Sequence, residues 1–70
     1  EDYKSALQER VQAIGRALPE YRVAAESGPD HRKMFTVEVV VGGETLGSAT
    51  GKAKKAAEQD AARQALDKLT

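Results

Sequence analysis

The sequence contains no cysteine, and its longest uninterrupted runs of apolar residues, such as Val39–Val41, are only three residues long. Without cysteine, neither a disulfide nor a thiolate metal site can stabilise the fold. Runs this short fall far below the roughly 20 apolar residues of a membrane-spanning helix. No apolar signal segment leads the chain either. We therefore expect a soluble, cytoplasmic domain without membrane contact.

An excess of charge of either sign is also missing. Eleven lysine and arginine residues balance eleven aspartate and glutamate residues, so the formal net charge is zero. A zero net charge argues against a domain that binds nucleic acid through bulk charge alone. The distribution is uneven, however, because Lys52, Lys54 and Lys55 fall within four residues while the acidic residues are scattered. Any electrostatic attraction is expected at a local patch.

Seventy residues allow one small domain, residues 1–70. A chain of this size buries only about 60% of the surface that its unfolded form exposes, so the fold must be compact. Residues 2–17 predict an amphipathic helix that Asp2 caps and that ends between Gly15 and Pro19. Its apolar stripe follows spacings of 4, 3 and 4 residues and consists of Leu7, Val11, Ile14 and Leu18.

The middle of the chain has the pattern of three β-strands. The first strand begins at Glu20, where one set of residues alternates with another: Tyr21, Val23 and Ala25 against Glu20, Arg22 and Ala24. The turn at residues 27–30 is followed by a second strand with one buried face, formed by Phe35, Val37, Val39 and Val41. Gly42-Gly43 predicts a hairpin into a third strand over residues 44–50. A three-stranded antiparallel sheet is expected.

A second helix is predicted from about Ala53 to Leu69. Ala57, Ala61, Ala65 and Leu69 recur every four residues, and such small side chains would let the helix lie close to its neighbour or to the sheet. The fold class is therefore α+β with the order α-β-β-β-α, a three-stranded antiparallel sheet with two helices packed on one face.

The lysine cluster lies at the start of this second helix. The location disfavours stability, because a helix N-terminus carries partial positive charge and each exposed lysine there costs about 0.3–1 kcal/mol. Lysines combined with free backbone N–H groups can form a site for an anion such as phosphate. The alternative is an ordinary solvated run of surface lysines, and the cluster alone does not decide between the two.

Two further features are weak when each is taken singly. The turn Gly28–His31 contains the only histidine, and without cysteine no metal site is expected there. No nucleophile or partner base is placed for catalysis, so we nominate no catalytic residue. Gln8 and Glu9 lie off the apolar stripe of the first helix, and by themselves they indicate an ordinary solvent-exposed face.

Taken in order, these features form a more specific pattern. Residues 2–9 match an opening helix, and Pro19–Tyr21 match the entry to a first strand. Residues 28–35 match a Gly-Pro-x-His loop that is followed, four residues after the histidine, by phenylalanine. A basic second helix is matched by Lys54–Ala57 together with Ala61-Ala62. Over nearly its whole length the chain resembles the double-stranded RNA-binding domain family.

This resemblance implies three regions of contact along about 16 base pairs of duplex RNA, recognised by shape. Gln8 and Glu9 would reach 2′-hydroxyls and base edges in one minor groove. The next minor groove would receive a loop consisting of Gly28, Pro29, Asp30 and His31, with the Pro29 carbonyl and His31 at 2′-hydroxyls. Lys54 and Lys55, helped by Lys52, would bridge the phosphates of the major groove between them.

Three positions depart from the family pattern. Ala49 stands where the first of two glycines is usual, Ala53 where a serine or threonine commonly caps the second helix, and Glu58 where some members carry a third lysine. The start of that helix therefore stays open, as does which of Lys52 and Lys54 leads the phosphate contact. A weaker grip on phosphate is expected from Glu58.

Residues 56–66, together with the opening helix, resemble the C-terminal domain of bacterial ribonuclease III. This resemblance implies a homodimeric parent, a double-strand-specific endoribonuclease of rRNA and mRNA processing whose separate acidic nuclease domain uses magnesium. The present segment would be its monomeric substrate-binding module, without a cofactor of its own. Alternatives are a domain of the same fold used for protein association and a ribosomal-protein RNA-binding domain. The presence of His31, Lys54 and Lys55 favours RNA binding over association.

Overall fold

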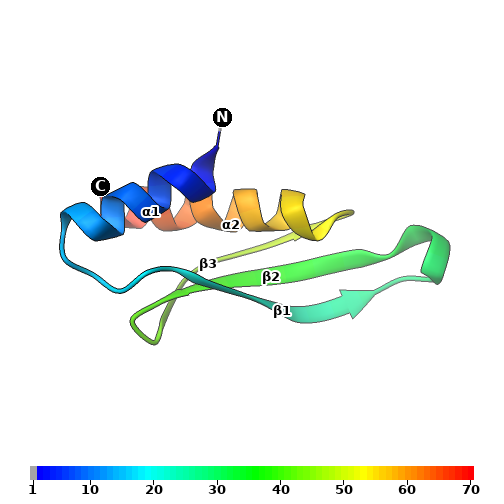
Figure 1. Ribbon diagram of the computed structural model, residues 1–70. Coiled ribbons are helices and arrows are strands. Elements are labelled where there is room, and N and C mark those ends of the chain that lie inside the picture. Colours follow the sequence, from blue (N-terminus) through cyan, green and yellow to red (C-terminus); the bar gives the residue numbers. More distant parts are fainter. Residues whose placement is uncertain (1) are drawn as a thin grey trace.

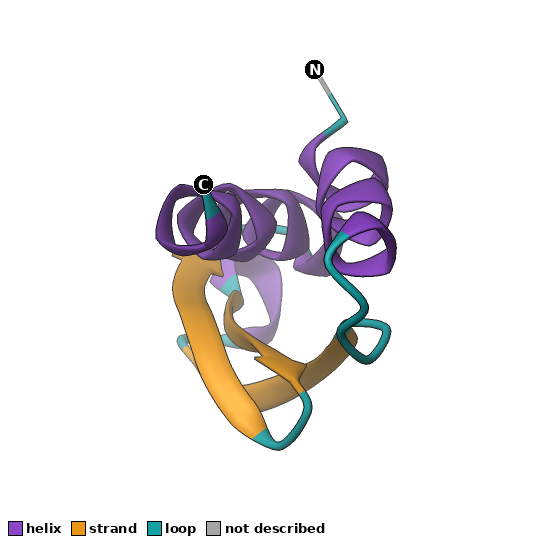
Figure 2. Cartoon of the chain, turned by 90° about the vertical axis from the view of Figure 1, so that its left-hand side faces the viewer, coloured by secondary structure: helices purple, strands orange, loops and turns teal. Residues whose placement is uncertain are grey.

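A computed structural model describes residues 2–70, which follow the order helix, three strands, helix. The elements are α1 (Tyr3–Ala13), β1 (Glu20–Ser27), the short 3-10 helix η1 (Asp30–Arg32), β2 (Met34–Val41), β3 (Glu44–Gly51) and α2 (Lys54–Leu69). The antiparallel strands have the order β1-β2-β3, and both helices cover the same face of the sheet (Figures 1 and 2). The expected α-β-β-β-α architecture is confirmed.

Helix α1 begins where its cap was predicted. Asp2 has an extended backbone, with φ −100° and ψ 93°, and its carboxylate accepts a hydrogen bond from the Ser5 N–H at 3.2 Å. The Ser5 hydroxyl donates a second bond to the same carboxylate at 2.7 Å. The side chain thus supplies an acceptor for a backbone donor that has no partner within the helix.

The end of α1 differs from the prediction, because the helix stops at Ala13 rather than at residue 17. Gly15 adopts φ +73°, and the Arg16 N–H donates to the Val11 carbonyl at 2.8 Å while the Gly15 N–H donates to the Gln12 carbonyl at 3.2 Å. These paired bonds around a left-handed glycine form a Schellman motif, which terminates a helix. Gly15, and not Pro19, ends α1.

This early end removes two residues from the apolar stripe of α1. Leu7 and Val11 are fully buried, as expected, but Ile14 is 41% exposed and Leu18 is 54% exposed. The prediction that the stripe continues through both was wrong, because residues beyond Ala13 no longer follow the helical period.

In the sheet, β2 has the alternation that was predicted. Val37, Val39 and Val41 are buried beneath the helices, whereas Phe35, the fourth member of the predicted buried face, is only partly buried. The hairpin to β3 turns at Gly42 and Gly43, whose φ angles of 58° and 82° suit a type I′ turn.

The simple alternation predicted for β1 is interrupted. The pairing register with β2 shifts between Val23 and Ala25, which marks a β-bulge. Val23 is 40% exposed and Ala25 is also exposed, so only Tyr21 of the expected apolar set packs against the core. The first half of β1 therefore joins the core, and its second half leads out to the loop before η1.

Small residues let α2 lie directly on β3. Ala57, Ala61, Ala62 and Ala65 are all buried. A Cβ atom added to Gly47 on β3 would lie 2.2 Å from the backbone oxygen of Ala61, so the two backbones approach as closely as a glycine allows. The close packing expected from the alanine stripe is confirmed, and it fixes the position of the α2 N-terminus over the sheet. Neither helix among the described residues is long and apolar enough to cross a membrane.

Candidate nucleic-acid interface

The three lysines before and within the first turn of α2 are the basic residues that stand out. Lys52, Lys54 and Lys55 are exposed, and none of them takes part in the ion pairs found among residues 2–70. The basic residues that do form ion pairs with acids are Lys4, Arg16, Arg22, Lys33 and Arg63. The neutral net charge therefore hides a patch of positive charge that the protein's own carboxylates do not neutralise.

The structure fixes the start of α2, which the sequence left open. Ala53 is the N-cap, with extended φ −129° and ψ 144°, and it makes no side-chain capping bond. Lys54 is therefore the first helical residue, Lys55 the second, and Lys52 precedes the helix. The first N–H groups of a helix have no acceptor within it, so the lysines surround backbone donors that can bind an anion.

Phe35 at the start of β2 supports this lysine patch. The Lys54 ammonium lies 5.4 Å from the centroid of the Phe35 ring, which is within cation–π distance. The phenylalanine of the loop motif thus has a geometric connection to the second helix, although 19 positions separate the two residues in sequence. This contact helps to orient the Lys54 side chain.

The loop between β1 and β2 has a tightly determined shape. Gly28 adopts φ +86°, and a Cβ atom at this position would lie 2.5 Å from the Arg32 carbonyl oxygen, so glycine is required on both counts. The Pro29 carbonyl accepts a hydrogen bond from the Arg32 N–H at 2.8 Å, which closes η1. A carbonyl oxygen has a second lone pair, so Pro29 retains an acceptor site for a further donor. Asp30 and His31 are exposed on η1.

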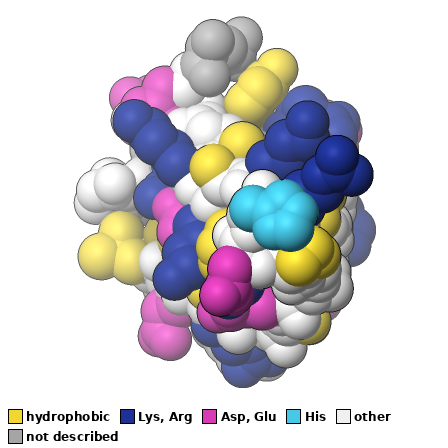
Figure 3. Space-filling view, turned by 90° about the vertical axis from the view of Figure 1, so that its right-hand side faces the viewer, with side chains coloured by type: hydrophobic (Ala, Val, Ile, Leu, Met, Phe, Trp, Pro, Cys, Tyr) yellow, Lys and Arg dark blue, Asp and Glu magenta, His cyan; other side chains and the backbone are white. Residues whose placement is uncertain are grey.

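A hollow of about 1010 Å³ connects this loop to the lysine patch. It is lined by η1 and the residues that follow it, with Lys52 on the other side; the lining residues are Asp30, His31, Arg32, Lys33, Met34, Phe35 and Lys52. Figure 3 views this end of the molecule and shows the histidine beside a group of lysine and arginine side chains. Two of the three predicted contact regions are therefore neighbours.

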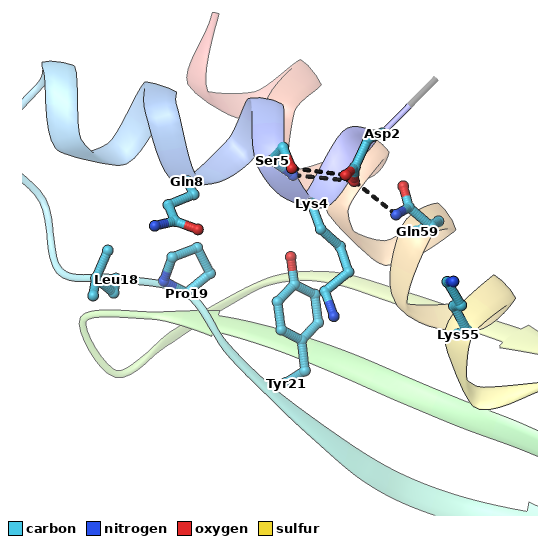
Figure 4. Close-up of a pocket in the computed structure, with 9 residues that line it drawn as sticks. All are labelled: Asp2, Lys4, Ser5, Gln8, Leu18, Pro19, Tyr21, Lys55 and Gln59. Atoms are coloured by element: carbon cyan, nitrogen blue, oxygen red, sulfur yellow. Dashed lines mark hydrogen bonds between the residues drawn. The ribbon is translucent and has the colours of Figure 1, made fainter.

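A second hollow, of about 410 Å³, connects the lysine patch to α1. Gln8 and Lys55 both line it, together with Lys4, Tyr21 and Gln59 (Figure 4). Gln8 and Glu9 are exposed, but Glu9 does not line this hollow. The structure thus arranges all three predicted regions around the start of α2, with one hollow on each side.

Sequence reasoning missed a polar cluster that joins the two helices. Gln59 of α2 accepts a hydrogen bond from the Tyr3 N–H at 2.7 Å and donates one to the Asp2 carboxylate at 2.8 Å. The Lys4 ammonium pairs with the Glu58 carboxylate at 2.5 Å. These partners lie more than 50 residues apart, so only the repeated placement of polar residues on both helices could have suggested them.

Two pKa values reflect the electrostatics of this cluster. Hydrogen bonds from Gln59 and Ser5 lower the pKa of Asp2 from 3.8 to about 2, because they stabilise its charged form. Burial, and after it the negative charges of Glu58 and Asp2, raise the pKa of Tyr21 from 10.0 to about 12. The Tyr21 hydroxyl is buried and has no hydrogen-bond partner among the described residues. It is therefore kept neutral between charged neighbours.

One known protein family matches nearly the whole chain. Residues 3–69 match the model of the family described as "Double-stranded RNA binding motif". The chain therefore belongs to this family, and it is a domain that binds double-stranded RNA.

Curated relatives carry the name Ribonuclease 3. The protein from Roseiflexus sp. is 57% identical over 68 residues, and that from Streptococcus mutans is 56% identical over 68 residues. Each match covers 97% of this chain and 29% of the relative. The chain thus spans less than a third of the length of these relatives, and it is similar to the RNA-binding part of bacterial ribonuclease III.

Solved structures share the fold. A structure of Arabidopsis HYL1, described with its implications for miRNA processing, has a TM-score of 0.84 and 37% identity, and the match covers 99% of this chain and 97% of that one. A structure of Dicer from Pichia stipitis has a TM-score of 0.77 and 33% identity over 94% of this chain and 32% of that one. The α-β-β-β-α arrangement is common to all three.

Proposed function

We propose that this domain is the duplex-binding module of a ribonuclease III, and that it reads RNA shape through three regions centred on the start of α2. The observation that carries the assignment of sites is the set of exposed lysines Lys52, Lys54 and Lys55, which form no ion pair among residues 2–70. These lysines bind the phosphates on the two sides of a major groove.

The other two regions bind the minor grooves on either side. A-form RNA displays 2′-hydroxyls in a wide, shallow minor groove and hides its base edges in a narrow major groove. A hydroxyl both donates and accepts, so Gln8 and Glu9 bind it from α1, whereas a carboxylate that faced bare phosphate would be repelled. On the other side, the free lone pair of the Pro29 carbonyl and the His31 ring bind 2′-hydroxyls, and Asp30 accompanies them on the loop.

A titration of three nucleic acids tests this reading. A 20-base-pair RNA duplex, a DNA duplex of the same sequence and a single-stranded RNA are titrated at several salt concentrations. The RNA duplex is expected to bind best, because B-form DNA lacks 2′-hydroxyls and has different groove spacing. Equal affinity for all three would contradict recognition by shape.

Replacement of the lysines tests the phosphate contacts. The double variant Lys54→Ala/Lys55→Ala should weaken binding to every duplex sequence, and it should flatten the salt dependence by about one unit of slope per lost phosphate contact. Lys68→Ala is the matched control, since Lys68 is an exposed lysine in the last turn of the same helix. An unchanged slope in the double variant, or an equal loss in the control, would show that these lysines do not bind phosphate.

The parent protein is proposed from similarity. We place the domain in a homodimeric, cytoplasmic endoribonuclease of rRNA and mRNA processing, whose separate nuclease part holds magnesium. The identities of 57% and 56% to Ribonuclease 3 proteins support this parentage. The genomic sequence upstream of the codon for Glu1 provides the test, because an in-frame acidic nuclease domain is expected there and an unrelated domain would refute the assignment.

A further inference from the structure

Glu58 occupies a position that is unfavourable for a phosphate-binding helix. It lies on α2 three residues after Lys55 and four after Lys54, and residues at these spacings are neighbours on a helix surface. A free carboxylate here would repel phosphate. It would also compete with phosphate for the ammonium groups of both lysines, so the interface needs a means of restraining Glu58.

The structure contains such a restraint in Lys4. The Lys4 ammonium, on the first turn of α1, lies 2.5 Å from the Glu58 carboxylate. The same ammonium lies 4.7 Å from the centroid of the Tyr21 ring, so it is held from two sides. The two charged side chains are only 38% and 25% exposed, which limits the screening of the pair by water. Figure 4 shows the Lys4 side chain running beside the Tyr21 ring in the hollow that Lys55 also lines.

We propose that Lys4 is a positioning residue for RNA binding, because it captures the Glu58 carboxylate and so leaves Lys54 and Lys55 free for phosphate. Among residues 2–70, Glu58 forms an ion pair with Lys4 and with neither of the two helix lysines. The inference rests on the proposed function, since it assumes that Lys54 and Lys55 bind phosphate. It assigns to α1 an electrostatic role that differs from the groove contact of Gln8 and Glu9.

A set of variants at the two positions tests this role. Lys4→Met removes the charge and keeps an apolar stem that can pack on the Tyr21 ring. It should weaken binding of the 20-base-pair RNA duplex about threefold to fivefold, the effect of one unit charge at roughly 4–6 Å across water, and it should make the salt slope shallower. Addition of Glu58→Gln to Lys4→Met should restore both the affinity and the salt slope of the parent. Lys4→Arg keeps the charge and should bind like the parent.

Arg16→Met provides the matched control. Arg16 also forms a partly exposed ion pair, with Glu44 at 3.2 Å, and Glu44 lies at the start of β3, beside the β2–β3 turn. Arg16→Met changes the net charge by the same amount as Lys4→Met, but it should leave RNA binding unchanged. Equal losses in the two variants would overturn the inference in favour of a net-charge effect.

The outcomes separate this inference from the proposed function. If Lys4→Met/Glu58→Gln keeps a shallow salt slope, Lys4 itself touches phosphate and the inference is wrong. If Lys4→Met lowers only the thermal unfolding midpoint, with affinity unchanged below the transition, the role is structural and the inference is again wrong. If Lys54→Ala/Lys55→Ala has no effect, the proposed phosphate contact fails first, whatever Lys4 does.

Discussion

Replacement of Gly47 by alanine is the sharpest test of how α2 lies on the sheet. The added Cβ atom would lie 2.2 Å from the Ala61 carbonyl oxygen, more than 1 Å short of the 3.4 Å at which ordinary contact begins. It would also lie 3.2 Å from a methyl group of Val39. Because the closest atom belongs to the backbone of α2, no side-chain rotation can relieve the contact, and the helix must move away from β3.

The cost of this movement can be set against the stability of the whole domain. Overpacking of a core costs about 1–3 kcal/mol or more, and a gain of about 0.5–1 kcal/mol from replacing a flexible glycine offsets part of it. A net loss of about 2 kcal/mol is expected. A domain of this size has a free energy of unfolding of about 3.5–10 kcal/mol, so the loss is a large fraction of the total. The melting temperature should fall by about 8–16 °C.

Thermal unfolding followed by circular dichroism measures the effect, with urea unfolding as a second measurement. Gly51→Ala is the matched control, because it adds the same methyl group to the same strand. Its nearest contact would be 3.4 Å, to the Ala57 backbone nitrogen. That variant should melt within a few degrees of the parent. A melting temperature for Gly47→Ala within about 2 °C of the parent would refute the close approach of α2 to β3.

Three further predictions concern stability. Tyr21→Phe removes a buried hydroxyl without a partner among the described residues, and it should raise the free energy of unfolding by about 1 kcal/mol in urea. Folding raises the Tyr21 pKa from 10.0 to about 12, so the parent should lose stability as the pH rises from 10 to 12. The variant should lose less stability over this pH range. Folding lowers the Asp2 pKa from 3.8 to about 2, so its contribution is present above pH 3.8 and is lost as the pH falls toward 2. Asp2→Asn keeps a capping side chain, and its urea midpoint should therefore vary less with pH over this range; an identical pH profile would contradict the assignment. Ala53→Ser adds an N-cap acceptor to α2 and should stabilise the domain by about 1 kcal/mol in thermal unfolding, and no gain would mean that the N-terminus is already satisfied.

Elements with a regular pattern could be predicted from the sequence. The alanine stripe of α2 and the valine alternation of β2 each repeat several times, so one irregular position cannot mislead. The Gly42-Gly43 turn was predictable because a type I′ turn requires positive φ at both central positions and glycine adopts this conformation readily.

Boundaries and irregularities were harder to predict. Gly15 and Pro19 could each end α1, and the choice depends on backbone hydrogen bonds to Val11 and Gln12 that no residue pattern displays. The β-bulge between Val23 and Ala25 likewise arises from pairing with β2 and leaves no local signal. Both features reflect tertiary structure rather than propensity.

The candidate site could likewise be predicted only in part. The order of Gln8, the Gly28–His31 loop and Lys54-Lys55 indicated three regions, and the structure places hollows between them. The Lys4–Glu58 ion pair was not predictable, because it joins residues 54 positions apart and depends on how the two helices cross. From the sequence, Glu58 indicated only a weaker phosphate grip.

Net charge is a poor index of RNA binding for a domain built in this way. Charges more than about 8 Å apart on the surface are largely screened at physiological ionic strength, so only carboxylates near the start of α2 can oppose the three lysines there. The carboxylate on the adjacent turn, that of Glu58, is engaged by Lys4. The same helix start has no side-chain cap, and its lysines oppose the helix dipole. An external anion would relieve both of these unfavourable features, and in the proposed complex an RNA phosphate is that anion. Binding of RNA should therefore stabilise this end of α2.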